Sequence, residues 1–176
     1  TTLFRSIRVH AAGESGTVIK IDSTAYTLHN QLPMYSFRDM YFDTPDHGWM
    51  IGYTQENIDN GGVVFEYKNE EWNMHSAVDG RIYDIEFSSP GHGFITTATH
   101  IYAYNSTTDE WVQQDIPGYY QQYHLSLLDD NYGISVSDNY QVMTYENGVW
   151  STGPAPQVAD LACVYTTGHG SAWAVS

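Results

Sequence analysis

Residues 93–111, GFITTATHIYAYNSTTDEW, contain three short strands and the turns that join them. The first strand begins with Gly93 and Phe94, the second reads IYAY, and the third begins at Trp111. Polar residues separate the three segments, and apolar residues alternate with polar ones inside them. This pattern predicts antiparallel β-strands joined by tight turns.

The pattern recurs along the chain. Residues 48–72 contain GWMIG, VVFEY and KNEEW; residues 133–150 contain GISVS, QVMTY and ENGVW; residues 9–26 contain VHAAG, GTVIKI and DSTAY. The closing aromatic residues are Tyr26, Trp72, Trp111 and Trp150. Short strands that repeat at intervals of about 40 residues predict an all-β fold, a β-propeller of four to five blades with antiparallel strands.

The repeats divide one predicted domain, residues 1–176, into four units and a half unit. Their approximate bounds are 1–30, 31–77, 78–116, 117–154 and 155–176. The half unit would supply inner strands, and GTVIKI and AYTLH would supply outer ones, so the N- and C-terminal strands can close a four-bladed ring. Two alternatives stay open: residues 1–12 help to build a fifth blade, or another copy of the chain completes a larger ring as a homo-oligomer.

The composition narrows the classes of function. The 176 residues include 6 Lys and Arg against 21 Asp and Glu, which gives a formal net charge of −15. Such an acidic surface repels phosphates and anionic membranes, so we expect no nucleic-acid partner. No apolar run is long enough for membrane insertion as a helix. No leader peptide is visible and the chain starts at Thr1, so we expect a mature, trimmed or excised product. We expect a binding module of this kind to be extracellular or at the cell surface.

Three segments resemble a known family: GWMIG at 48–52, AWAV at 172–175 and GTVI at 16–19. With the strands, turns and closing aromatic residues around them, they resemble the propeller repeats of photosystem II assembly factors and related bacterial BNR-type (WAVG) repeats. The resemblance covers nearly the whole chain in short, degenerate repeats. The sialidase box S-x-D-x-G-x-T-W is absent, and the kelch Gly-Gly doublet does not stand at the matching place. The resemblance implies a scaffold that often binds protein, and it implies no reaction.

The repeat register also predicts which aromatic residues lie between blades. These are Trp49, Phe94 and Trp173 on the second strands and Trp72, Trp111 and Trp150 on the fourth strands. Cys163 stands alone in the alternating run LACVY, and we expect it to be a small buried apolar residue.

Three histidines precede glycine in equivalent turns of different repeats: His47, His92 and His169. Equivalent positions are spread around a ring, so the three side chains cannot share one ion at ligand distances of about 2 Å. We expect them to bind backbone groups of their turns. The sequence predicts no metal site and no cofactor.

A binding face is predicted where four connecting segments, 32–37, 55–59, 79–81 and 117–123, open onto one end of the ring. They gather aromatic and amide side chains that suit a carbohydrate or a protein partner. The candidate ligand-binding residues are Tyr119, Tyr120, Tyr123, Gln121, Gln122, Glu56 and Arg81. The tyrosines would stack on a sugar or fill a groove of the partner. The alternative is that they only cover blade edges.

No catalytic residue is predicted, because G-x-S-x-G, H-E-x-x-H and a GxGxxG followed by a helix are absent. Paired carboxylates occur in turns, at Asp43, Asp46, Glu70, Glu71, Asp129 and Asp130. A retaining glycosidase would need two of them about 5 Å apart. The leading interpretation is a non-enzymatic module for binding or assembly. The alternatives are a polysaccharide-active enzyme on the same scaffold, and a structural subunit of a repeating extracellular assembly.

Overall fold

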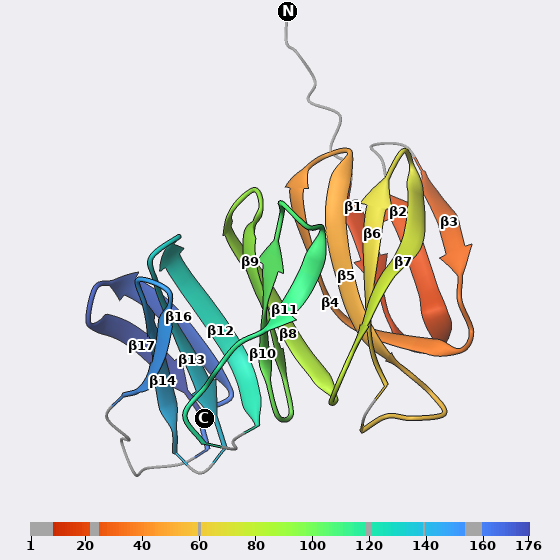
Figure 1. The fold of residues 1–176 in the computed structure, drawn as a ribbon. Coiled ribbons are helices and arrows are strands. Elements are labelled where there is room, and N and C mark those ends of the chain that lie inside the picture. Colours follow the sequence, from red (N-terminus) through yellow and green to blue (C-terminus); the bar gives the residue numbers. More distant parts are fainter. Residues whose placement is uncertain (1–8, 22–24, 60, 119–120, 139, 154–159) are drawn as a thin grey trace, which may run out of the picture.

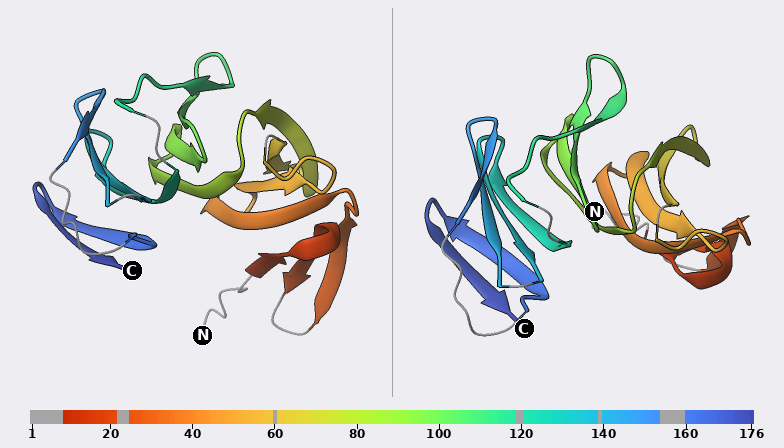
Figure 2. Two further views of the ribbon diagram at one scale, coloured as in Figure 1. Left: turned by 90° about the horizontal axis from the view of Figure 1, so that it is seen from below. Right: turned by 60° about the horizontal axis from the view of Figure 1, so that its bottom comes forward.

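The computed structural model describes residues 9–21, 25–59, 61–118, 121–138, 140–153 and 160–176. Their strands form five antiparallel sheets, which lie side by side in chain order (Figure 1). Seen along the blades, the sheets follow an arc (Figure 2). We number these sheets blades 1 to 5, and the prediction of an all-β fold with propeller blades is confirmed.

Blade 1 consists of β1 (Val9–Ala12), β2 (Thr17–Ile21) and β3 (Tyr26–Gln31), with the 3-10 turn η1 (Glu14–Gly16) between its first two strands. Blade 2 consists of β4 (Tyr35–Thr44), β5 (His47–Thr54), β6 (Gly62–Lys68) and β7 (Glu71–Val78). Blade 3 consists of β8 (Ile82–Ser89), β9 (His92–Thr97), β10 (Ile101–Asn105) and β11 (Glu110–Gln113).

Blade 4 consists of β12 (Gln122–Asp129), β13 (Tyr132–Ser137), β14 (Val142–Glu146) and β15 (Val149–Thr152). Blade 5 consists of β16 (Cys163–Gly168) and β17 (Ser171–Val175). In blades 2 to 4 each strand pairs with the next one in the chain. The first strands β4, β8, β12 and β16 run next to one another along the inner side of the arc (Figure 2). Among the described residues, no helix has the length and hydrophobicity that a membrane crossing requires.

Each of blades 2 to 4 carries the same tyrosine–tryptophan pair on its two outer strands. The pairs are Tyr67–Trp72, Tyr104–Trp111 and Tyr145–Trp150, with ring centroids 5.1, 5.2 and 5.2 Å apart. The three tryptophans are at most 9% exposed. The predicted burial of these closing tryptophans is therefore confirmed.

The second strand of the preceding blade supplies the ring that packs on each pair. Trp49 of β5 meets Trp111 edge-on at 5.5 Å and 87°, and Phe94 of β9 meets Trp150 at 5.5 Å and 86°. In blade 1 a histidine takes this place, because His10 of β1 lies 6.1 Å from the ring of Trp72. Such edge-to-face contacts add about 0.5–1.5 kcal/mol to the energy of apolar burial. The predicted positions of Trp49 and Phe94 between blades are confirmed.

A glycine opens the second strand because a side chain of the first strand lies across it. A Cβ atom on Gly93 would be 2.4 Å from the ring of Phe87, which is its partner on β8. Gly48 and Gly133 occupy the same position in blades 2 and 4 and are equally close to side chains of their first strands. The glycine near the start of each of these second strands thus has a packing cause.

The strands at the two ends of the described chain do not share a sheet. β1–β3 and β16–β17 are separate sheets, and they flank the open side of the arc (Figure 2). Trp173 of β17 is 77% exposed. Its predicted position between blades is therefore wrong, because no described sheet follows β17 and covers it. Cys163, expected to be buried, is only half-buried at the start of β16.

Candidate functional site

β-Bulges interrupt the first strands of blades 2, 3 and 4 at the same point. The pairing of the first and second strands shifts between residues 37 and 39, between 82 and 84, and between 122 and 124. The extra residues are Arg38, Tyr83 and Tyr123. A bulge bends its strand and changes the direction of the extra side chain. The sequence therefore presents one cation and two phenol rings from three consecutive blades.

These side chains form a continuous series with three neighbours. The guanidinium carbon of Arg38 lies 5.4 Å from the ring centre of Tyr53, and that of Arg81 lies 5.9 Å from Tyr53 and 5.8 Å from Tyr83. The rings of Tyr83 and Tyr123 meet edge-on at 5.2 Å and 81°. Both hydroxyls donate to Oε1 of Gln121, at 3.1 and 3.3 Å. We call Arg38, Tyr53, Arg81, Tyr83, Gln121 and Tyr123 the arginine–tyrosine ladder.

The ladder concentrates positive charge in a strongly acidic chain. Two of the 6 Lys and Arg residues belong to it, against 21 Asp and Glu in the whole sequence. Contacts between guanidinium and ring are worth about 0.5–1 kcal/mol at exposed sites, so they hold the two arginines in place. Within the described residues, the buried Nε–H of Arg81 has no hydrogen-bond partner. Burial raises the pKa of Tyr83, while the charges of Arg81 and Arg38 oppose that shift.

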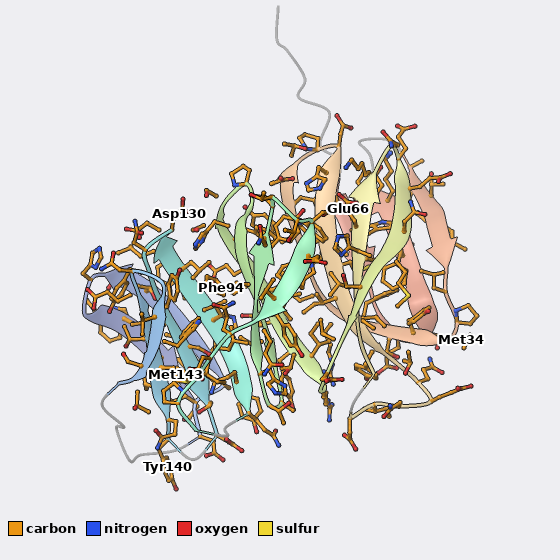
Figure 3. All side chains as sticks on the ribbon, in the orientation of Figure 1. Met34, Glu66, Phe94, Asp130, Tyr140 and Met143 are labelled. Carbon is orange, nitrogen blue, oxygen red and sulfur yellow. The ribbon has the colours of Figure 1, made fainter. Side chains whose placement is uncertain are left out.

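The ladder lies at one end of the blades, the lower end in Figure 1. The first strands of blades 2 to 4 begin there, and the connecting segments 32–37, 55–59 and 79–81 are at the same end (Figure 1). Met34 and Tyr140, which are 56% and 42% exposed, mark this edge in Figure 3. Three of the segments from which the sequence predicted a binding face, 32–37, 55–59 and 79–81, thus lie at the same end of the blades.

The predicted ligand-binding residues have different positions in the structure. Arg81, Gln121 and Tyr123 belong to the ladder. Glu56 is exposed in the loop after β5 and has no described contact with the ladder. Gln122 does not face a ligand: its side chain is fully buried, and its Oε1 accepts a hydrogen bond from Ser135 Oγ at 2.7 Å. Tyr119 and Tyr120 lie outside the described residues.

Sequence reasoning missed Arg38, Tyr53 and Tyr83. The repeat register aligns Arg38, Tyr83 and Tyr123 at one position of the first strand, and this alignment was the signal that could have found two of them. Tyr53 stands near the end of β5, outside the segment GWMIG that recurs in the repeats. A bulge is invisible in a pattern of apolar alternation, so the direction of these side chains could not be predicted.

In blades 2 and 3, the residue after the bulge points into the following blade. Asp39 Oδ2 accepts a hydrogen bond from the backbone N–H of Ile85 at 3.4 Å, and Asp84 Oδ2 accepts one from Leu125 at 2.7 Å. Two residues further along β8, Glu86 Oε2 accepts a hydrogen bond from the backbone N–H of Leu127, in the next blade, at 3.0 Å. These carboxylates satisfy edge groups of the adjacent first strand, so they join blades to each other.

Burial changes the titration of this group. Desolvation, followed by the contact with Asp39, raises the pKa of Asp84 to about 8. Desolvation also raises the pKa of Glu86 to about 7. Burial lowers the pKa of His124, which follows the bulge of blade 4. Because the two carboxyl groups with raised pKa values are engaged with backbone N–H groups, their environment fits a role in blade packing.

The paired turn carboxylates have separate local partners. Asp43 Oδ1 lies 2.7 Å from Nδ1 of His47, whose Nε2 lies 3.0 Å from Glu66. Asp130 accepts hydrogen bonds from Ser88 and Ser89 of blade 3, at 2.6 and 2.7 Å, and these bonds lower its pKa. Asp43 therefore acts through His47 to tie its turn to β6, and Asp130 ties its turn in blade 4 to blade 3.

The three turn histidines also have separate surroundings. Nδ1 of His92 lies 3.1 Å from Ser88 Oγ, and Nε2 of His169 lies 3.7 Å from Asp129 of blade 4. His47 belongs to blade 2, His92 to blade 3 and His169 to blade 5. Among the described residues, no three His, Cys, Asp or Glu side chains are grouped as a metal site requires.

Comparison with known proteins gives structural similarity alone. No protein-family model matches the sequence, and no curated protein matches it. A structure described as YCF48 bound to D1 peptide aligns with a TM-score of 0.69 and 15% identity, over 97% of this chain and 57% of that one. Regucalcin, a calcium-binding protein from Agrobacterium tumefaciens, aligns at 0.63 and 12% identity, over 89% and 59%. A nidogen/laminin complex aligns at 0.66 and 10% identity, over 96% and 70%.

The fold and these comparisons define the class: the chain is a β-propeller. It spans 57% and 59% of the first two structures it resembles. Identities of 10–15% establish the fold only. Membership of the BNR-type repeat family accordingly remains a prediction from the sequence.

Proposed function

We propose that this propeller is a non-enzymatic binding module that holds an extended segment of a protein partner on the arginine–tyrosine ladder. The observation that carries the proposal is the convergence of Arg38, Arg81 and three phenol rings from three blades. The ladder therefore offers charge and apolar ring surface on one stretch, and tyrosine and arginine are enriched at protein interfaces.

The chemistry of the ladder favours a peptide with a carboxylate. Arg38 and Arg81 can each hold a carboxylate in a two-pronged contact, which lysine cannot imitate. The rings of Tyr53, Tyr83 and Tyr123 can pack against an apolar side chain beside that carboxylate. Since the chain as a whole is acidic, most of its surface would repel a negatively charged partner, whereas the two arginines of the ladder would attract it.

Two of the similar structures support a protein partner. One is described as YCF48 bound to D1 peptide and another as a nidogen/laminin complex, so propellers with this arrangement of blades occur in complexes with protein. Carbohydrate is the second candidate, because Gln121 between the two hydroxyls of Tyr83 and Tyr123 resembles the amide and ring pairs that hold sugars.

A selection from a displayed library of random peptides tests the proposal. Peptides chosen by the wild-type chain should share an acidic residue next to an apolar or aromatic one. Arg38→Ala with Arg81→Ala should weaken their binding about tenfold or more, the effect of losing interface hot-spot residues. Lys68→Ala is the control, because it removes an exposed positive charge at the end of β6, outside the ladder.

Added salt should weaken the binding of the selected peptides, because their contact with the two arginines joins opposite charges. Peptides that bind the double arginine variant as well as the wild type would refute the ladder as the site. A glycan array probed with the wild type and with Tyr123→Ala tests carbohydrate, the second candidate partner. Glycan binding that depends on Tyr123 in the absence of peptide binding would replace the protein partner by a carbohydrate.

A further inference from the structure

The contacts between consecutive blades in this chain follow one rule. A ring on the second strand of one blade packs on the tyrosine–tryptophan pair of the next blade. Trp49 packs on Trp111, and Phe94 packs on Trp150, both at 5.5 Å between ring centroids. Beside Trp49, Tyr41 stacks on Phe87 of blade 3 at 4.9 Å. Each blade therefore has a donor face, which supplies this ring, and a receiving face, which carries the pair.

Blade 5 carries a donor face that no described residue covers. Tyr165 pairs with Trp173 in the register in which Tyr41 pairs with Trp49. Tyr165, Trp173 and Val175 are 70%, 77% and 61% exposed, whereas Trp49 is 1% exposed. On the opposite face of the same sheet, Val164 of β16 is buried with Leu161 against blade 4, while the small residues Ala172 and Ala174 of β17 are exposed. The large apolar side chains that this sheet exposes thus all lie on the face that would meet a further blade.

Blade 1 carries the matching receiving face. Ile21 pairs with Tyr26 as Tyr67 pairs with Trp72, and Leu28 follows at the position of Met74. Ile21, Tyr26 and Leu28 are 36%, 76% and 50% exposed. In blade 2 the equivalent pair is covered by blade 1, which leaves Tyr67 and Trp72 only 0% and 5% exposed. Met74 is 50% exposed there, like Leu28, so the difference between a covered and an uncovered face lies in Ile21 and Tyr26.

We propose that the donor face of blade 5 packs on the receiving face of blade 1 of a second copy of this chain. The contact would continue an interface that the chain already forms between its own blades. The two faces differ, so two copies associate head to tail and each copy carries both halves of the interface. Both faces flank the open side of the arc, where a second copy can approach them (Figure 2).

The inference goes beyond the proposed function, because the ladder belongs to blades 2 to 4. The effect of salt distinguishes the association of two copies from the binding of a peptide on the ladder. Each copy carries a formal net charge of −15, so screening should strengthen the contact between copies. The same salt should weaken an acidic peptide on the ladder. Failure of one proposal therefore leaves the other intact.

Trp173 provides a direct optical probe of the contact. The other four tryptophans are at most 9% exposed, so quenching of tryptophan fluorescence by acrylamide reports mainly on Trp173. With increasing protein concentration, the mass from light scattering should rise to at least twice that of one chain. Over the same range the fraction of quenchable fluorescence should fall.

Two variants, each with one face disabled, test the head-to-tail geometry. Trp173→Asp disables the donor face and Tyr26→Asp the receiving face, and both residues are more than two-thirds exposed, so neither change removes a contact inside one copy. Each variant alone should lose association by about thirtyfold or more, as for an interface hot spot. An equimolar mixture should regain dimers, because one intact donor face meets one intact receiving face.

Val149→Asp is the control, since Val149 is 63% exposed on β15, away from both faces. It should associate like the wild type. A wild-type chain that stays monomeric at all concentrations, with Trp173 freely quenched, would overturn the proposal and leave these faces to a different partner. A mixture of the two variants that stays monomeric while the wild type associates would also overturn it, because the contact would then join like faces.

Discussion

Asp84 should make the stability of this propeller decrease as the pH rises through neutrality. The residue is 7% exposed, and its carboxyl group accepts a hydrogen bond from the backbone N–H of Leu125 at 2.7 Å and contacts the carboxyl group of Asp39. A charged group in this place is poorly solvated and close to a second negative charge, so the protonated form is favoured. The substitution Asp84→Asn keeps an oxygen for the N–H of Leu125 and removes the titration.

The size of the effect follows from the shifted pKa. Burial and the contact with Asp39 raise the pKa of Asp84 from 3.8 to about 8. Between these values the folded chain holds a proton that the unfolded chain releases. The stability from this group is therefore complete below pH 3.8 and is lost as the pH rises to about 8. The slope is about 1.4 kcal/mol per pH unit, so about 2.7 kcal/mol is lost between about pH 5 and about pH 7.

Urea unfolding at a series of pH values measures this slope. Glu86, whose pKa burial raises to about 7, adds to the slope in wild type and variant, so their difference isolates Asp84. Asp84→Asn should remove about 1.4 kcal/mol per pH unit and be more stable than the wild type at about pH 7. Glu110→Gln, on the exposed start of β11, is the control and should leave the slope unchanged. If Asp84→Asn has the wild-type slope, Asp84 is ionised in the folded chain and the reasoning is refuted.

Two further substitutions test the packing of the blades by urea unfolding. Trp111→Ala should destabilise the fold by about 3–5 kcal/mol, the usual cost of removing a buried tryptophan side chain. Val112→Ala, at an exposed position of the same strand, should change stability by less than about 0.5 kcal/mol. Equal effects of the two substitutions would contradict the blade register. Gly93→Ala should cost about 1–3 kcal/mol, because its Cβ would overlap the ring of Phe87. Gly13→Ala has free space for its Cβ and should be nearly neutral, so an equal loss there would show that the overlap with Phe87 is not the cause.

The sequence predicts the propeller because its strongest signals are local and repeated. The tyrosine–tryptophan pairs belong to two-strand hairpins, and the glycine before Trp49 or Phe94 reflects a contact between adjacent strands. Such contacts follow from the pattern of one repeat, so their recurrence was enough to place Trp72, Trp111 and Trp150 in the core. Burial against the next blade then followed for Trp49 and Phe94.

The failure at Trp173 has a different origin. Its position on its own sheet matches that of Trp49. Burial depends on a neighbouring sheet, and the described residues place none against β17. A repeat pattern predicts where a side chain points within its blade, whereas coverage by another blade is a property of the whole assembly.

The binding face stays a prediction, and its residues were harder to predict than its loops. Segments 32–37, 55–59 and 79–81 lie at one end of the blades, yet Gln122 is buried and Tyr83 was missed. Alternation assigns odd and even positions of a strand to opposite faces, and one extra residue exchanges them. A bulge precedes Asp39, Asp84 and His124 in their strands. The assignment of side chains to one face or the other near the start of each first strand was therefore uncertain by one residue.

The bulges connect the two properties of this surface. In blades 2 and 3 the extra residue, Arg38 or Tyr83, joins the ladder, and the next residue, Asp39 or Asp84, turns into the following blade and binds a backbone N–H there. The residue that meets solvent and the residue that joins two blades are therefore neighbours in sequence. Without the extra residue, the strand would keep its regular alternation. The side chain at the position of Arg38 or Tyr83 would then lie between two blades and would not join the ladder. The same local irregularity thus builds a surface that spans three blades and fixes those blades relative to one another, which is what a rigid binding site composed of separate sheets requires.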